Sequence, residues 1–156
     1  MDLGSTLRLA LDLLERSDIR GIPTDTQLDL CLAAFGVRCE EVSDAPPCLR
    51  EVLLGKRLII NANLSENWRR WLKGHALGHL VCRHHGNHFK MAPLAIRRQE
   101  DESNIFAGCF LSGALVLLMV LSAPVLATYA MIPPECAELW LSLTREVPSI
   151  AASRPE

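Results

Sequence analysis

Residues 65–82 read S-E-N-W-R-R-W-L-K-G-H-A-L-G-H-L-V-C, and they are the most informative stretch of the chain. Ser65 is a typical helix N-cap, and apolar residues recur from Trp68 onward at the three- and four-residue spacing of a helix. The Gly-Asn pair at 86–87 can adopt the left-handed conformation that ends helices. We therefore expect one helix that runs from Ser65 to about His85.

Two histidines stand four residues apart on this expected helix. A helix would place His75 and His79 on one face, one turn apart, as in many metal sites. The spacing alone does not establish a metal site, because histidine pairs also occur on solvated helix faces. Zinc requires at least one further donor, and the acidic run at 100–102 offers candidates. Acidic residues at a helix start also have a purely structural role, since they interact favourably with the helix dipole.

We predict structural rather than catalytic roles for the side chains around the two histidines. The basic residues Arg69, Arg70 and Lys73 are expected on the solvated face of the helix, and the tryptophans within it are expected to pack. The three later histidines, at 84, 85 and 88, are interpreted as helix-terminal and loop residues rather than as ligands.

The remaining segments predict a mainly helical chain with a small sheet. Thr24 followed by Gln27 forms a capping-box pattern, and Gly36 ends the helix that this pattern starts. Because strands are expected only in the middle of the chain, the order of elements indicates an α+β fold. Helices are expected over 3–14, 24–35, from near Arg97 until Pro124 interrupts, and after Pro133-Pro134, and strands over 37–40, 52–54 and 58–60.

Composition sets limits on size, partners and compartment. The chain has 156 residues, 49% of them hydrophobic, which fits one domain over 1–156 with a frayed tail from Ser149. Sixteen basic residues against 18 acidic ones leave no basic field for a nucleic-acid backbone, so direct nucleic-acid binding is not expected. The six cysteines contain no C-x-x-C pair, and the N-terminus lacks the pattern of a signal peptide. We expect a cytoplasmic protein with reduced thiols.

One long segment carries no charge. From Ser103 to Pro134 there is no Asp, Glu, Lys, Arg or His. The part from Phe110 to Met131 is long enough to cross a bilayer, but polar residues and Pro124 interrupt it and no basic residue flanks it closely. We favour a buried helix over a membrane span. If part of the 110–131 surface is exposed, we expect it to form an interface with a second copy or with a partner protein.

Several spaced segments together resemble the ImmA/IrrE family of zinc metallopeptidases. That family carries H-E-x-x-H on one helix and E-x-x-A-[ND]-x-F-A on the next, and this chain has G-H-A-L-G-H-L at 74–80 and E-D-E-S-N-I-F-A at 100–107. The similarity covers roughly 5–146 and includes G-I-P at 21–23 and the strand at 58–61. The resemblance implies a zincin-like α+β domain, with a small sheet beside two ligand helices. It also implies a partner protein, typically a repressor of the helix-turn-helix type.

The resemblance implies a role for each matching residue. His75, His79 and Glu100 would be the ligands of one zinc ion, and Asn104 would hold a histidine N–H. Glu102 is the alternative carboxylate ligand. The family glutamate lies four residues before the Asn position, as Glu100 does here, whereas Glu102 lies only two residues before it. It also projects about 200° away from Glu100 around the helix.

Cys82 is a further alternative ligand, because it lies seven residues after His75 and thiolate binds zinc well. A buried thiol that packs beside the site is the interpretation that we prefer for it.

The chain departs from the family motif at the position after the first histidine. In the family this residue is the glutamate that acts as general base, whereas here it is Ala76, which cannot move a proton. Two explanations fit: an inactivating substitution in an enzyme, or the natural residue of a pseudoenzyme. The sequence therefore leaves two functions open. One is a metallo-endopeptidase scaffold that is inactive as written, and the other is a non-catalytic module that binds a protein or a ligand in the same cleft.

Overall fold

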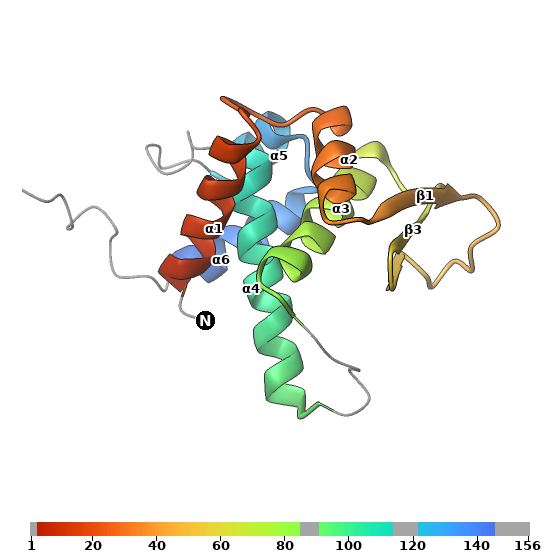
Figure 1. Cartoon of the computed structure of the whole chain (residues 1–156). Helices are drawn as coiled ribbons and strands as arrows, with labels where there is room; N and C mark the ends of the chain where they lie inside the picture. Colours follow the sequence, from red (N-terminus) through yellow and green to blue (C-terminus); the bar gives the residue numbers. More distant parts are fainter. Residues whose placement is uncertain (1–2, 85–90, 114–121, 146–156) are drawn as a thin grey trace, which may run out of the picture.

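A computed structural model of the chain describes residues 3–84, 91–113 and 122–145. Within these ranges six helices accompany a small three-stranded sheet, which confirms the predicted α+β class (Figure 1). The elements are α1 Leu3–Arg16, α2 Asp25–Ala34, β1 Arg38–Val42, β2 Glu51–Leu54, β3 Arg57–Asn61, α3 Glu66–Val81, α4 Pro93–Ser112, α5 Ala123–Ala130 and α6 Pro134–Arg145. The predicted tail from Ser149 lies outside the described residues.

The sheet lies at one end of α3 and has the order β1-β3-β2 (Figure 1). β1 pairs with β3 in parallel, and β2 and β3 form an antiparallel hairpin whose turn uses Gly55 at φ +59°. The central strand carries the fully buried Leu58 and Ile60, which join the hydrophobic core. β2 is therefore an edge strand, and among the described strands it pairs only with β3.

Helices α3 and α4 pack closely against each other. A Cβ placed on Gly78 would lie 2.8 Å from the Cα and 2.9 Å from the carbonyl oxygen of Ser103, so only glycine permits this approach of the two backbones. Further along the same helices, Phe106, Phe110 and Leu77 are fully buried in the core. The close packing sets the distance between side chains on the facing turns of the two helices.

Helix α3 is shorter than the sequence predicts. It ends at Val81, and Arg83 adopts the left-handed conformation at φ +55°, whereas the expected stop at 86–87 lies outside the described residues. Just after Arg83, His84 contacts His79 of α3 and Glu102 of α4.

Both prolines near helix boundaries begin helices. Pro93 is the first residue of α4, which therefore starts four residues before the predicted Arg97, and Pro124 lies in the first turn of α5. Proline is tolerated in the first turn because the N–H that it lacks has no intrahelical acceptor there. The predicted start of α4 near Arg97, after a loop containing Pro93, was therefore wrong, whereas the predicted interruption before or at Pro124 agrees with the end of α4 at Ser112 and the start of α5 at Ala123.

Much of the described part of the uncharged segment is buried. Phe110 and Leu111 at the end of α4 are fully buried, as are Leu126 and Ala130 of α5. Trp140 of α6 donates its indole N–H to the carbonyl of Ile105 at 3.0 Å and so joins α6 to α4. No helix in the described ranges is long and apolar enough to cross a membrane. Residues 114–121, in the middle of the segment, lie outside those ranges.

Two of the three basic residues on α3 are buried, contrary to the prediction of a solvated face. Arg70 is 2% exposed and bonds the carbonyls of Pro23 and Ala130 as well as the carboxylate of Asp25. Lys73 is 6% exposed and forms an ion pair with Asp29 at 2.8 Å. Buried charges are found where partners satisfy them, and α2 supplies both carboxylates.

Candidate metal centre

Three side chains from α3 and α4 converge on one point. Nε2 of His75 and Nε2 of His79 are 3.0 Å apart, and the Glu100 carboxylate lies 3.3 Å from the first and 3.5 Å from the second. One ligand atom from each residue lies within 4.8 Å of the other two, so the group could hold a metal ion. In the part of the chain that the structure describes, this is the one such group.

The ring of His75 is oriented by Asn104. Nδ1 of His75 lies 3.0 Å from Oδ1 of Asn104, one turn after Glu100 on α4. An amide oxygen only accepts hydrogen bonds, so Nδ1 carries the proton and donates it. Nε2 then presents its lone pair to the centre of the group, which is the tautomer that a metal ligand requires.

A second hydrogen-bond chain orients His79. Its Nδ1 lies 3.0 Å from Nδ1 of His84, and Nε2 of His84 lies 2.8 Å from the Glu102 carboxylate. The carboxylate accepts from Nε2–H of His84, so Nδ1 of a neutral His84 accepts from Nδ1–H of His79. Nε2 of His79 therefore also turns a lone pair toward the centre. His84 was predicted to be a helix-terminal residue rather than a ligand, and it does lie outside the group of three; together with Glu102 it contacts the site from outside.

The donor set calls for a cation. Two imidazole lone pairs and a carboxylate face one another at 3.0 to 3.5 Å, an arrangement that repels unless a proton or a metal ion lies between them. Burial lowers the pKa of His75, but a hydrogen bond that the protonated ring would donate to Glu100 and the charge of Glu51 outweigh this effect, so that the pKa is raised overall. The residues present thus fit a divalent metal held by nitrogen and oxygen ligands.

Glu51 of β2 adds a second carboxylate beside the group. Its Oε1 lies 3.9 Å from Nε2 of His75, and its side chain is 21% exposed. Burial raises the pKa of the Glu51 carboxyl to about 7; His75 opposes the rise and Glu100 adds to it. Sequence reasoning missed this residue, because a glutamate before the apolar run 52–54 has no distinguishing pattern.

The other two positions singled out in the sequence lie apart from the three donors. Ala76 is 2% exposed, packs in the core and brings no polar atom to the site. Cys82 is buried outside the group, and burial together with the charge of Glu102 raises its thiol pKa to about 11. Its sulfur is not among the donor atoms that lie close together, so the structure offers no support for Cys82 as a ligand.

A groove of about 430 Å³ runs beside the site. One wall is the edge strand β2 with the residues just before it, and the other comes from α3, α4 and α6. The groove opens onto His75 and Asn104, so an occupant of the groove would contact the metal site. Its lining residues are Cys48, Leu49, Arg50, Glu51, Trp68, Trp71, Leu72, His75, Asn104, Cys136 and Leu139.

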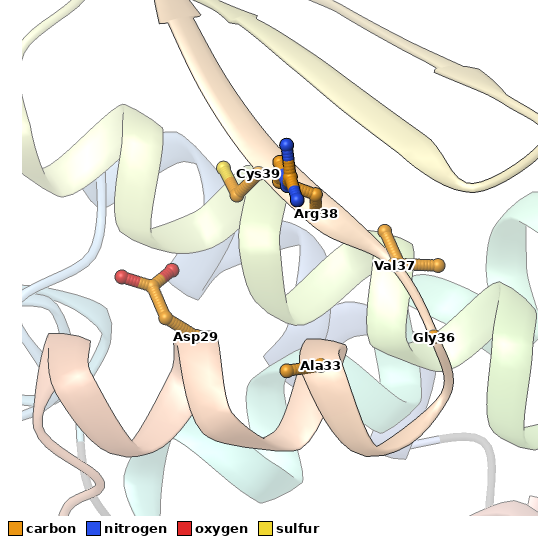
Figure 2. Close-up of a pocket in the computed structure, with 6 residues that line it drawn as sticks. All are labelled: Asp29, Ala33, Gly36, Val37, Arg38 and Cys39. Carbon is orange, nitrogen blue, oxygen red and sulfur yellow. The ribbon is translucent and has the colours of Figure 1, made fainter.

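A second pocket lies between α2 and β1, away from the histidines (Figure 2). Asp29 and Ala33 line it from the helix, and Arg38 and Cys39 line it from the strand. Asp29 is already paired with Lys73, and burial raises the pKa of the Cys39 thiol to about 11. This pocket brings together no set of groups suited to catalysis or to metal binding.

The family assignment follows from the segment that builds the metal centre. Residues 30–112, from α2 to the end of α4, match the peptidase M78 family, described as the IrrE N-terminal-like domain. The chain belongs to this family. The match includes every residue of the two ligand-bearing turns and the position occupied by Ala76, so the alanine stands within an otherwise recognisable IrrE-like domain.

Solved structures agree on the fold of this IrrE-like domain. A transcriptional regulator from Mycobacterium tuberculosis superposes with a TM-score of 0.69 at 16% sequence identity. The superposition covers 89% of this chain and 46% of that protein, so the IrrE-like domain spans less than half of its structural relative. Among curated proteins none matches the chain.

Proposed function

We propose that this IrrE-like domain binds one zinc ion through His75, His79 and Glu100. The observation that carries the proposal is the convergence of the two Nε2 atoms and one carboxylate on a single point. Two histidines and one glutamate are the ligand set of many zinc hydrolases, which leave one position open. Zinc held in this way polarises a carbonyl group and makes water a stronger nucleophile.

Peptide hydrolysis by the family mechanism is lost in this chain. The general base should stand at residue 76, but alanine can neither accept a proton from water nor deliver one to the leaving amine. Such help contributes about 10²- to 10⁴-fold in rate. Glu100 cannot replace it while its carboxylate binds metal. The domain is therefore a metallopeptidase scaffold that is inactive as written.

The occupant of the groove would be an extended segment of a partner protein. β2 is an edge strand whose first residue, Glu51, lines the groove, and an extended peptide can pair with an edge strand through main-chain hydrogen bonds. The partly exposed Trp68 and Leu139 offer apolar surface to its side chains. A repressor of the helix-turn-helix type is the partner that the family resemblance suggests, and none of the six cysteines forms a disulfide, in keeping with a cytoplasmic location.

The second candidate function is a non-catalytic binding module. It is favoured by one observation: Ala76 removes the proton-transfer group while the histidines, Asn104 and the groove are retained. In this case the groove would hold a protein or a regulatory ligand without cutting it.

Metal analysis followed by one substitution tests the proposal. The purified protein should hold one zinc per chain, and His75→Ala and His79→Ala should each abolish it. Ala76→Glu should then give zinc-dependent cleavage of a cognate repressor that the unaltered protein leaves intact. If Ala76→Glu binds zinc but cleaves nothing, the binding module is the correct function. Zinc-free protein whose properties do not change in either histidine variant would refute the metal site itself.

A further inference from the structure

Glu51 carries a buried carboxylate oxygen that has nothing to bond to. Its Oε2 is shielded from solvent and has no hydrogen-bond partner among the residues that the structure describes. Its Oε1 lies 3.9 Å from Nε2 of His75, beyond hydrogen-bond distance. A buried carboxylate oxygen without a donor is strongly unfavourable, so its position calls for a partner that the described residues do not supply.

Two carboxylates flank the same histidine from different elements. Glu100 approaches Nε2 of His75 at 3.3 Å from α4, and Glu51 approaches it at 3.9 Å from β2. Like charges around one imidazole oppose each other unless a cation lies between them. The negative charges of the Glu51 and Glu100 carboxylates would balance the double positive charge of a divalent ion held by the three donors.

Glu51 lies outside the ligand group itself. Its oxygens are not among the ligand atoms that lie within 4.8 Å of one another, so it does not complete a closed four-ligand site. It does line the groove together with His75 and Asn104, where a molecule bound at the open side of the metal would sit. A carboxylate in this position would contact a molecule bound to the metal rather than the metal itself. We call such a group an outer carboxylate.

We propose that Glu51 is an outer carboxylate of the metal centre, which accepts a hydrogen bond from water or another donor held at the open side of the site. It thereby places an acidic group at the centre from β2, where Ala76 of α3 provides none. The inference rests on the proposed zinc site and adds to it, since neither the family motif nor the ligand spacing involves residue 51.

Zinc affinity, measured by competition with a chelator, tests the role of Glu51. Glu51→Gln should weaken zinc binding about 10- to 100-fold, as expected for the loss of an outer partner. Glu51→Met, which keeps the size of the side chain but not its polarity, should do the same. The matched control is Glu40→Gln on β1, which removes a partly exposed carboxylate paired with Arg57 and should leave the affinity unchanged.

Thermal unfolding of the metal-free proteins separates this role from a structural one. Near pH 8 metal-free Glu51→Gln should melt at the same temperature as the unaltered protein or higher, because it removes an unpartnered buried charge. Loss of zinc affinity without loss of stability supports the proposal. A lower melting temperature in both Glu51 variants would assign Glu51 a structural role and overturn it.

The absorption spectrum of the cobalt-substituted protein distinguishes an outer group from a ligand. Glu100→Gln should change the cobalt bands, whereas Glu51→Gln should leave their positions close to those of the unaltered protein. If Glu51→Gln binds zinc as tightly as the unaltered protein, the inference is wrong and the proposed zinc site stands. If the unaltered protein binds no zinc, the proposed function fails first and the inference with it.

Discussion

Nδ1 of His75 donates a hydrogen bond to Oδ1 of Asn104 across 3.0 Å, and this contact joins the two helices that build the candidate metal centre. Asn104 follows Glu100 by one turn of α4, so a single helix face delivers both a ligand and the group that orients another ligand. Outer contacts of this kind fix the tautomer and direction of a metal-binding imidazole.

Asn104→Ala should weaken zinc binding about 10- to 100-fold, because the His75 ring loses the acceptor that sets its tautomer. Asn104→Asp keeps an acceptor at the same place and should stay close to the unaltered protein. Chelator competition measures both. Equal affinities for Asn104→Ala and the unaltered protein would show that the ring needs no such support.

His84→Ala should also reduce zinc affinity about 10- to 100-fold, because His84 accepts a hydrogen bond from Nδ1–H of His79 and donates one to the Glu102 carboxylate. Glu102→Gln should have a smaller effect in the same direction, because a neutral amide oxygen is a weaker acceptor. Isothermal titration with zinc compares the three proteins. If Glu102→Gln abolished binding while Glu100→Gln did not, the ligand assignment on α4 would have to be exchanged.

Gly78→Ala should lower the free energy of unfolding by about 1 to 3 kcal/mol, because the added methyl group would lie under 3 Å from the Ser103 backbone and push α4 away from α3. Zinc affinity should fall as well, since the ligands come from both helices. Gly21→Ala is the control, as a methyl group there meets no atom within 4 Å. Chemical denaturation of metal-free protein measures the difference.

Arg70→Ala should destabilise the fold by about 3 to 5 kcal/mol, because it leaves the carbonyls of Pro23 and Ala130 without their buried donor and removes the partner of Asp25. Arg57→Ala removes an exposed partner of Glu40 and should have a far smaller effect, because exposed ion pairs contribute little to stability. Urea denaturation distinguishes the two. A small effect at Arg70 would mean that water replaces its contacts.

Glu51 should make the metal-free protein less stable as the pH rises. Its pKa is about 7 in the folded state, above the ordinary value of 4.5, so the folded state holds the proton more tightly than the unfolded state does. This stabilising contribution is present below about pH 4.5 and is lost as the pH rises through about 7. Between pH 5 and pH 8 the unaltered protein should therefore lose stability relative to Glu51→Gln, by on the order of 1–3 kcal/mol. A constant difference between the two proteins would contradict the raised pKa.

Local patterns in the sequence predicted the helices and the sheet well. The capping box at Thr24 and Gln27 forms as predicted, and the strands around Gly55 pair as a hairpin. These features depend on residues close together in the chain, so composition and spacing contain the information. The ends of α3 and α4 were less predictable, because contacts of His84 and the first-turn position of Pro93 decide them.

Burial of polar groups was predictable only in part. A basic residue on a helix is normally solvated, and nothing near Arg70 in the sequence indicates that α2 and the carbonyl of Ala130 would enclose it. The same holds for Glu51, whose surroundings come from α3 and α4 rather than from β2. Such residues acquire their roles from elements that lie 20 to 60 positions away in the chain.

The sequence by itself determined that two histidines share one face of a helix, because this follows from helical spacing. That alanine stands where the family has its proton-transfer group follows from the resemblance of this segment to the ImmA/IrrE family. Only the tertiary structure decided that Glu100 completes the donor group, that Glu102 and His84 support it from outside, and that Glu51 lies beside it. The physical reason is that the geometry of the ligands depends on two things: how closely α3 and α4 pack at Gly78, and where β2 places its side chains. Long-range contacts set both.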